Sequence, residues 1–134
     1  MLNKVIIIDD GLFDRSLIEK LVKKYSFAAQ VTGFSDARDA VAYLQLVKND
    51  PNEFPSMIFL DIYMPMMSGF EFLDKYMELP EGARDLCTVI MISSTFRIED
   101  SQRMSVYPAV KKFLYKPFSA QMLLELQELY VLNS

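Results

Sequence analysis

The stretch SMIFLDIYMPMMSGFEFL (Ser56–Leu73) combines a short apolar run, a charged residue and a turn that leads into a helix. The run Met57–Leu60 is continuously apolar, which is typical of a strand buried on both faces of a parallel sheet. Asp61 follows at once. A carboxylate at the end of a buried strand is costly unless it is paired, bound to a metal or exposed at a rim. Asp61 therefore needs partners from elsewhere in the chain.

Further apolar runs of strand length flank this stretch, and helical patterns separate them. The runs are Lys4–Ile8, Gln30–Phe34, Thr88–Ile92 and Lys112–Tyr115. Helical patterns fall at residues 17–25, 37–44, 72–77, 99–107 and 119–132. Candidate N-caps are Asp36, Ser68 and Ser119. This strand–helix alternation predicts right-handed crossovers, with helices on both faces of a parallel sheet.

Composition narrows the classes of function. With 134 residues and 51% apolar content, the chain suits one domain with one core, and its net charge of −4 disfavours direct nucleic-acid binding. The absence of histidine excludes a histidine metal site, a Ser-His-Asp triad and a Cys-His pair, and a single cysteine, Cys87, excludes an internal disulfide. No apolar run approaches the roughly 20 residues of a membrane span, and no signal peptide precedes the first strand. We therefore expect a cytoplasmic protein without membrane insertion.

Polar side chains follow the predicted strands at their carboxyl ends, where parallel sheets bind ligands. These side chains are Asp9, Asp10, Asp61, Ser93, Ser94 and Lys116, and strand register favours Ser93 over the adjacent hydroxyls of Ser94 and Thr95. Three neighbouring carboxylates repel one another, and a hard divalent cation such as Mg²⁺ removes that repulsion. Lys116 can balance negative charge on the other side. The sequence therefore predicts a Mg²⁺ site at this edge of the sheet.

A carboxylate beside a metal can also attack phosphorus and form an aspartyl-phosphate. Phosphoryl transfer needs positioning and positive charge around the moving oxygens more than it needs a general base. Mg²⁺ and Lys116 would supply the charge, while Ser93 and backbone N–H groups would supply hydrogen-bond donors. The missing histidine is then no obstacle, and the residues predict phosphoryl transfer to Asp61.

Four motifs make the chain resemble the receiver (response regulator) domain of two-component signalling, in its single-domain, chemotaxis-regulator-like form. They are IIDD (Ile7–Asp10), FLDIYMPMMSGFEFL (Phe59–Leu73), MISS (Met91–Ser94) and FLYKPF (Phe113–Phe118). Each motif alone is weak to moderate evidence, but all four in order, each at a strand end, are highly specific. The resemblance covers essentially the whole chain. It implies one receiver domain over residues 1–134 with no output domain, whether the chain is stand-alone or excised from a longer protein.

The implied fold is α/β and flavodoxin-like: a doubly wound (βα)5 arrangement with a five-stranded parallel sheet of order 2-1-3-4-5. The resemblance also implies a role for each matching residue. Asp61 resembles the phosphoacceptor, and Asp9 and Asp10 resemble the acidic pair that holds Mg²⁺ or Mn²⁺. The remaining assignments are the backbone carbonyl of Tyr63 as a metal ligand, Lys116 and Ser93 as phosphoryl-binding side chains, Ile62 and Ser94 as backbone contacts, Ser93 and Phe113 as the switch pair, and Pro117 as a cis-peptide candidate.

A receiver is a signalling switch and not an enzyme, apart from its own phosphotransfer and autodephosphorylation. The resemblance implies that a sensor histidine kinase or a histidine phosphotransfer protein donates the phosphoryl group. The fourth helix, fifth strand and fifth helix would then present a changed face to a downstream protein, or to a second copy in a phosphorylation-dependent dimer.

One residue departs from the family pattern, and two others, Tyr63 and Thr95, occupy the family's variable positions that flank the active site. Gly11 follows the acidic pair, where the family often carries another acid or a bulkier residue. Tyr63 is a bulky residue two positions after the phosphoacceptor. We predict that Tyr63 hinders the water that attacks the acyl phosphate, so that the phosphorylated state is long-lived.

Three alternatives share features with this interpretation. A pseudo-receiver would keep the fold as a scaffold without being phosphorylated. A phosphatase of the haloacid dehalogenase type also uses an aspartate nucleophile, but its nucleophile follows the first strand and has a second aspartate two residues on. Here Asp61 follows the third strand and Tyr63 occupies the second position. A flavodoxin would need a Ser/Thr- or Gly-rich phosphate loop after the first strand, which this chain lacks.

Overall fold

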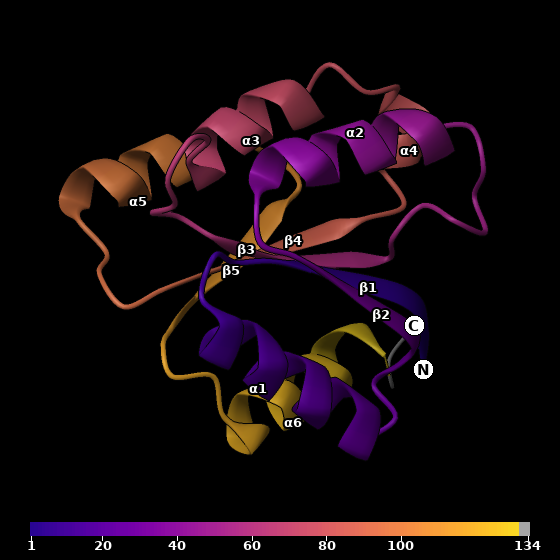
Figure 1. The fold of residues 1–134 in the computed structure, drawn as a ribbon, viewed down its shortest axis with the longest axis vertical. Helices are drawn as coiled ribbons and strands as arrows, with labels where there is room; N and C mark the ends of the chain where they lie inside the picture. Colours follow the sequence, from indigo (N-terminus) through magenta and orange to yellow (C-terminus); the bar gives the residue numbers. More distant parts are fainter. Residues whose placement is uncertain (132–134) are drawn as a thin grey trace.

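A single parallel sheet of order β2-β1-β3-β4-β5 organises residues 1–131, the part of the chain that the computed structural model describes (Figure 1). Its strands are β1 (Leu2–Ile8), β2 (Ala28–Phe34), β3 (Met57–Asp61), β4 (Thr88–Ser93) and β5 (Val110–Tyr115). All neighbouring strands pair in parallel. The predicted flavodoxin-like fold and its strand order are confirmed.

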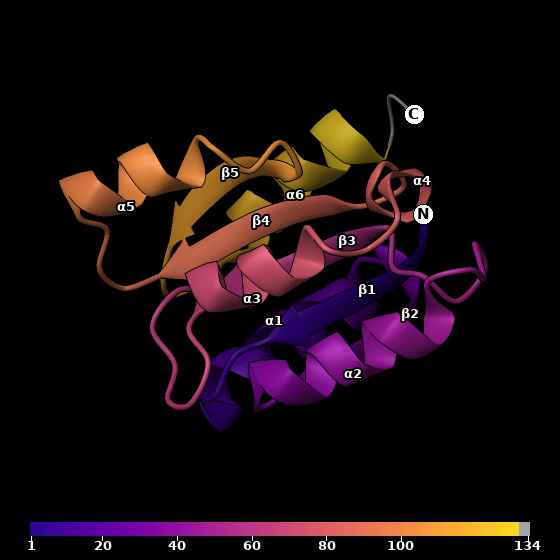
Figure 2. The same ribbon diagram turned by 90° about the horizontal axis from the view of Figure 1, so that it is seen from above.

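Helices cover both faces of the sheet. They are α1 (Leu12–Lys24), α2 (Ala37–Val47), α3 (Gly69–Tyr76), α4 (Glu81–Arg84), α5 (Ile98–Met104) and α6 (Ala120–Tyr130). Helices α1 and α6 lie on one face, and α2, α3, α4 and α5 lie on the other (Figures 1 and 2). No helix within residues 1–131 is long and apolar enough to cross a membrane.

Helix α4 corrects the expectation of five helices. It is a single turn that begins after Pro80, whose carbonyl accepts hydrogen bonds from the N–H groups of Ala83 and Arg84. Four residues are too few to show a helical apolar period, so the sequence pattern could not reveal this turn. The fourth and fifth helices of the predicted output face are therefore α5 and α6 in this chain.

The helix ends follow local capping. The side chains of Asp36, Ser68 and Ser119 accept hydrogen bonds from the first turns of α2, α3 and α6, which confirms the predicted N-caps. Helix α5 ends at Met104, three residues before the predicted end at residue 107. Helix α6 ends at residue 130, and the predicted end at residue 132 lies outside the described part of the chain.

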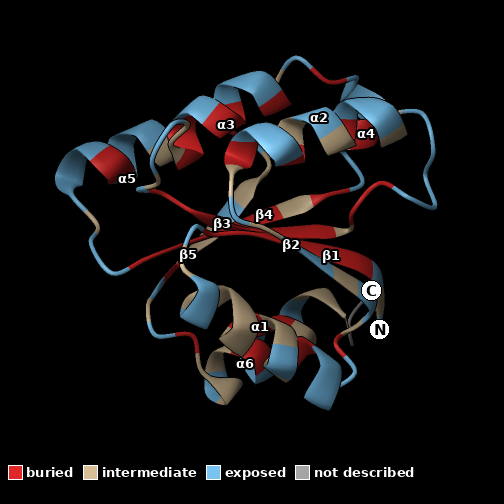
Figure 3. Cartoon of the chain, in the orientation of Figure 1, coloured by how far each residue is buried: buried red, intermediate tan, exposed pale blue. Residues whose placement is uncertain are grey.

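The core is divided by the sheet into two apolar layers (Figure 3). Ile6 and Ile8 of β1 face the layer beneath α2 and α3, while Val5 and Ile7 face α1 and α6. Strands β1, β3 and β4 are almost fully buried, whereas the edge strands β2 and β5 are partly exposed. Burial on both faces explains the continuous apolar runs, and the edge position of β2 explains its weaker run.

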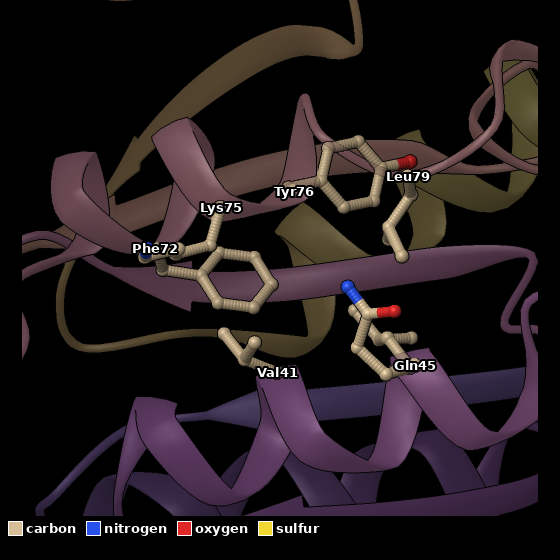
Figure 4. Close-up of a pocket in the computed structure, with 7 residues that line it drawn as sticks. Val41, Gln45, Phe72, Lys75, Tyr76 and Leu79 are labelled. Carbon is tan, nitrogen blue, oxygen red and sulfur yellow. The ribbon is translucent and has the colours of Figure 1, made fainter.

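A shallow hollow marks the seam between α2 and α3 (Figure 4). Its lining is largely apolar and includes Val41, Phe72 and Leu79. The polar groups that line it are those of Gln45, Lys75 and Tyr76, and no carboxylate is among them. The seam belongs to the packing of the two helices, and the clustered acids of the chain lie at the strand ends.

Candidate functional site

Strands β1 and β3 bring the acidic residues together. Ile8 pairs with Leu60, so Asp9 and Asp61 follow at the same level of the two neighbouring strands. One carboxylate oxygen each from Asp9, Asp10 and Asp61 can be chosen so that all three lie within 4.8 Å of one another. Asp9 and Asp61 are buried, while Asp10 is exposed at the rim. This all-oxygen donor set is of the kind that Mg²⁺ and Mn²⁺ prefer.

Lys116 extends from the end of β5 into the same cluster. Its Nζ lies 2.9 Å from Asp9 Oδ2, 3.2 Å from Asp14 Oδ2 and 3.4 Å from Asp61 Oδ2. Its backbone N–H donates to the carbonyl of Ser93 at 3.0 Å, which ties the ends of β4 and β5 together. The Lys116–Pro117 peptide bond is cis.

The charge balance of the cluster is negative. Burial raises the pKa of Asp61 to about 7, and repulsion from Asp9 and Asp10 adds to this rise, against the attraction of Lys116. Burial alone would lower the pKa of Lys116, but its contacts with Asp9, Asp61 and Asp14 outweigh burial and raise that pKa. Both pKa values reflect the same imbalance: the site holds more carboxylates than ammonium groups. Lys116 is stabilised in its charged form by several carboxylates, whereas Asp61 shares the single ammonium with its acidic neighbours. A divalent cation would supply the missing positive charge.

Ser93 is the last residue of β4, and its side chain is buried beside the cluster. Its Oγ accepts a hydrogen bond from the backbone N–H of Thr95 at 3.2 Å. Ser94 and Thr95 are exposed beyond the strand. Of the three neighbouring hydroxyl residues, Ser93 is thus the one that the strand holds in place.

Phe113 lies on β5 opposite Met91 and is partly buried. Its ring stacks on Phe96, with centroids 3.9 Å apart and planes at 14°. The ring of Tyr115 is nearly perpendicular to that of Phe113, with centroids 4.9 Å apart and planes at 87°. Sequence reasoning singled out Phe113 but missed Phe96, whose role depends on the path of the loop after β4.

Tyr63 links the loop after β3 to helix α5. Its hydroxyl donates to Asp100 Oδ2 at 2.5 Å, and the Arg97 guanidinium lies 5.2 Å from the centre of its ring. The same Asp100 oxygen accepts from the backbone N–H of Arg97 at 2.9 Å. Asp100 is buried, so a residue adjoining the acidic cluster is fixed to the first turn of α5. In the sequence, Asp100 is one of two adjacent acids in a helix and carries no signal of this contact.

Gly69 makes room for the loop between β3 and α3. A Cβ at this position would lie 2.4 Å from the backbone oxygen of Asp61. The Gly69 N–H donates to the carbonyl of Ile62 at 2.8 Å. Among the described residues of this loop, the positive φ falls at Met66 and not at the glycine. Gly69 therefore serves close approach, which positions Asp61 and Ile62.

Comparisons with known proteins agree with this geometry. A family model described as "Response regulator receiver domain" matches residues 5–128. The chain is 33% identical to chemotaxis protein CheY of Listeria monocytogenes, over 93% of this chain and 95% of that protein. It is 34% identical to two-component response regulator ARR9 of Arabidopsis thaliana, over 84% of this chain but only 53% of that protein, so it spans about half of that relative's length. A solved two-component response regulator from Cytophaga hutchinsonii superposes with a TM-score of 0.86, at 22% identity, over 99% of this chain and 98% of that one.

Proposed function

Because the chain belongs to the response regulator receiver domain family, we propose that it is a phosphorylation switch with Asp61 as its phosphoacceptor. The observation that carries this proposal is the convergence of Asp9, Asp10 and Asp61 with the Lys116 ammonium at one edge of the sheet. Receiver domains are signalling switches and not classical enzymes. The proposed chemistry is therefore limited to the chain's own phosphorylation and dephosphorylation.

In the proposed reaction, a carboxylate oxygen of Asp61 attacks the phosphorus of a phosphohistidine on a kinase or phosphotransfer protein. An O–P bond forms while the P–N bond breaks, and the imidazole leaves with the electron pair. Asp9, Asp10, Asp61 and the backbone carbonyl of Tyr63 would hold Mg²⁺, which when bound supplies positive charge near the phosphoryl oxygens. Lys116 would neutralise charge on the opposite side.

Hydrogen-bond donors complete the proposed phosphoryl site. The Oγ of Ser93 accepts from Thr95, so its O–H remains available to donate to a phosphoryl oxygen. The backbone N–H groups of Ile62 and Ser94 are the further proposed donors. An acyl phosphate adds negative charge at neutral pH, which strengthens each of these contacts.

The proposed output face consists of α5, β5 and α6. Movement of Ser93 toward the phosphoryl group would free space for Phe113, which would then leave its stack on Phe96. Exposed apolar side chains on these elements include Ile98 of α5, Tyr115 of β5 and Leu124 of α6. We propose that phosphorylation shifts the population of the chain between two conformations of this face. A cytoplasmic downstream protein, or a second phosphorylated copy, would bind the conformation that phosphorylation favours.

Beryllofluoride with Mg²⁺ tests this function against the pseudo-receiver alternative, because it imitates an aspartyl-phosphate. We expect saturable binding, with amide chemical-shift changes at the strand ends and along α5 and β5. A chain that gives no response at any attainable concentration would be a pseudo-receiver. A phosphatase would instead turn over phosphate monoesters, and we expect no such turnover.

Tyr63→Asn is expected to shorten the lifetime of the phosphorylated state. Removing the bulky ring should admit water to the acyl phosphate, and a barrier lower by about 1.4 kcal/mol would speed dephosphorylation roughly tenfold. Loss of label after removal of the phosphodonor measures this rate. Tyr63→Phe is the matched control, because it keeps the ring and loses only the hydroxyl that donates to Asp100. An unchanged rate in Tyr63→Asn would show that the ring does not limit water access.

A further inference from the structure

We propose that Asp14 is a positioning residue for Lys116, holding part of its ammonium in the unphosphorylated protein and competing for it with a phosphoryl group on Asp61. This inference rests on the proposed function, since it concerns the same site. Asp14 is not among the residues that the family motifs or the acidic cluster identify. It enters from the first turn of α1.

The distances place Asp14 among the direct partners of Lys116. The ammonium lies 3.2 Å from Asp14 Oδ2, closer than the 3.4 Å that separates it from the phosphoacceptor Asp61. The Lys116 side chain is only 15% exposed and that of Asp14 is 32% exposed, so water screens this ion pair only in part. Before phosphorylation, Lys116 is thus drawn toward α1 as well as toward β3.

Gly11 provides the space that Asp14 occupies. A Cβ at Gly11 would lie 3.2 Å from Asp14 Oδ2 and 3.3 Å from Asp9 Oδ1. The backbone of Gly11 is extended, with φ of −83°, so the torsion itself does not require glycine. A side chain at this position would press on both carboxylates, which would have to shift by a few tenths of an ångström. The glycine after the acidic pair thus leaves room for the Asp14 carboxylate beside that of Asp9, where it can contact Lys116.

A competing role for Asp14 follows from the order of the contacts. Asp9 holds the ammonium at 2.9 Å, with a buried carboxylate, and would keep Lys116 in the site without Asp14. Without the charge of Asp14, the Lys116 ammonium would interact more strongly with the phosphoryl oxygens. Asp9 would still keep the lysine in the site. Asp14 sets how strongly Lys116 responds to phosphorylation.

The test is the affinity for beryllofluoride in saturating Mg²⁺, measured by chemical-shift titration. Losing a partly exposed ion pair of this kind should change the dissociation constant about two- to fivefold. Asp14→Asn should therefore bind beryllofluoride about two to five times more tightly than the natural chain. Asp14→Glu keeps the charge and should return the affinity toward the natural value. Glu19→Gln, on the same helix but paired with Lys23, is the control and should change nothing.

A Lys116→Met background separates positioning from simple repulsion. If Asp14 acts through Lys116, Asp14→Asn should no longer change beryllofluoride affinity once the lysine is gone. A gain of the same size in that background would overturn the proposal, as would an unchanged affinity of Asp14→Asn in the natural background. Failure of the natural chain itself to bind beryllofluoride would instead overturn the proposed function, and this inference with it. Urea unfolding of each variant shows whether it is folded.

Discussion

Asp61→Asn is expected to raise the free energy of unfolding of the metal-free protein at about pH 8, on the order of 2 kcal/mol after allowance for solvent at the rim. The reason is that the Asp61 carboxylate is buried and repelled by its acidic neighbours, which raises its pKa from 3.8 to about 7. Asparagine removes that charge in a side chain of similar size. The Lys116 ammonium keeps its partners Asp9 and Asp14.

The sign of this effect depends on pH. Between about pH 4 and pH 7 the folded chain retains a proton on Asp61 that the unfolded chain has lost, so stability falls as pH rises through this window. Asp61→Asn has no such proton, so its stability should not fall in this way between about pH 4 and pH 7. The two proteins should be similarly stable near pH 4 and should separate progressively up to about pH 8.

Urea unfolding in the presence of a chelator measures this difference. Asp39→Asn, at an exposed position in the first turn of α2, is the matched control and should show no comparable pH-dependent gain. With excess Mg²⁺ the order should reverse, because the natural chain binds the metal more tightly and therefore gains more stability from it. A variant less stable than the natural chain at pH 8 without metal would contradict the electrostatic account of the site.

The affinity for Mg²⁺ is expected to fall about tenfold per pH unit below pH 7, and about a hundredfold between pH 7 and pH 5. Metal binding must displace the proton that Asp61 holds with a pKa of about 7. Above that pH the carboxylate is already ionised, and the affinity should level off.

Calorimetric titration at several pH values measures this dependence. Repeating it in buffers of different ionisation enthalpy counts the protons released, and the count should approach one below pH 6. Asp61→Asn should bind weakly and without this pH dependence. A constant affinity between pH 5 and pH 7 in the natural chain would show that Asp61 does not contribute its carboxylate to the metal.

Much of the fold could be predicted because its strands are short, continuous and apolar. The runs Lys4–Ile8, Met57–Leu60 and Thr88–Ile92 belong to the central strands, where both faces are buried. Parallel strands end at one edge, so the residues after them could be assigned to one site without any coordinates. Asp9, Asp61 and Lys116 come at the ends of three such strands, and they lie together at that edge.

The contacts that sequence reasoning missed depend on how helices and loops pack onto the sheet. Asp14 and Asp100 look like ordinary acids in the first turns of helices, where acids are common. Only the packed structure shows that Asp14 reaches Lys116 and that Asp100 accepts a hydrogen bond from Tyr63.

Lys4 illustrates the same limit at the opposite end of the sheet. A charged residue at the start of a strand is usually solvated, yet Lys4 is only 6% exposed. Its ammonium donates to the hydroxyl of Tyr43 and lies 3.3 Å from a carboxylate oxygen of Glu53. This contact anchors the loop before β3, and only the folded arrangement of α2 and that loop reveals it.

The central claim is that Asp61 accepts the phosphoryl group, and peptide mapping after incubation with acetyl phosphate and Mg²⁺ tests it most directly. The account predicts that one phosphoryl group is added, that it maps to Asp61, and that Asp61→Asn remains unlabelled while still folded. Chelation of the metal should prevent the labelling. A phosphoryl group that maps to another residue, or labelling that persists in folded Asp61→Asn, would contradict the account.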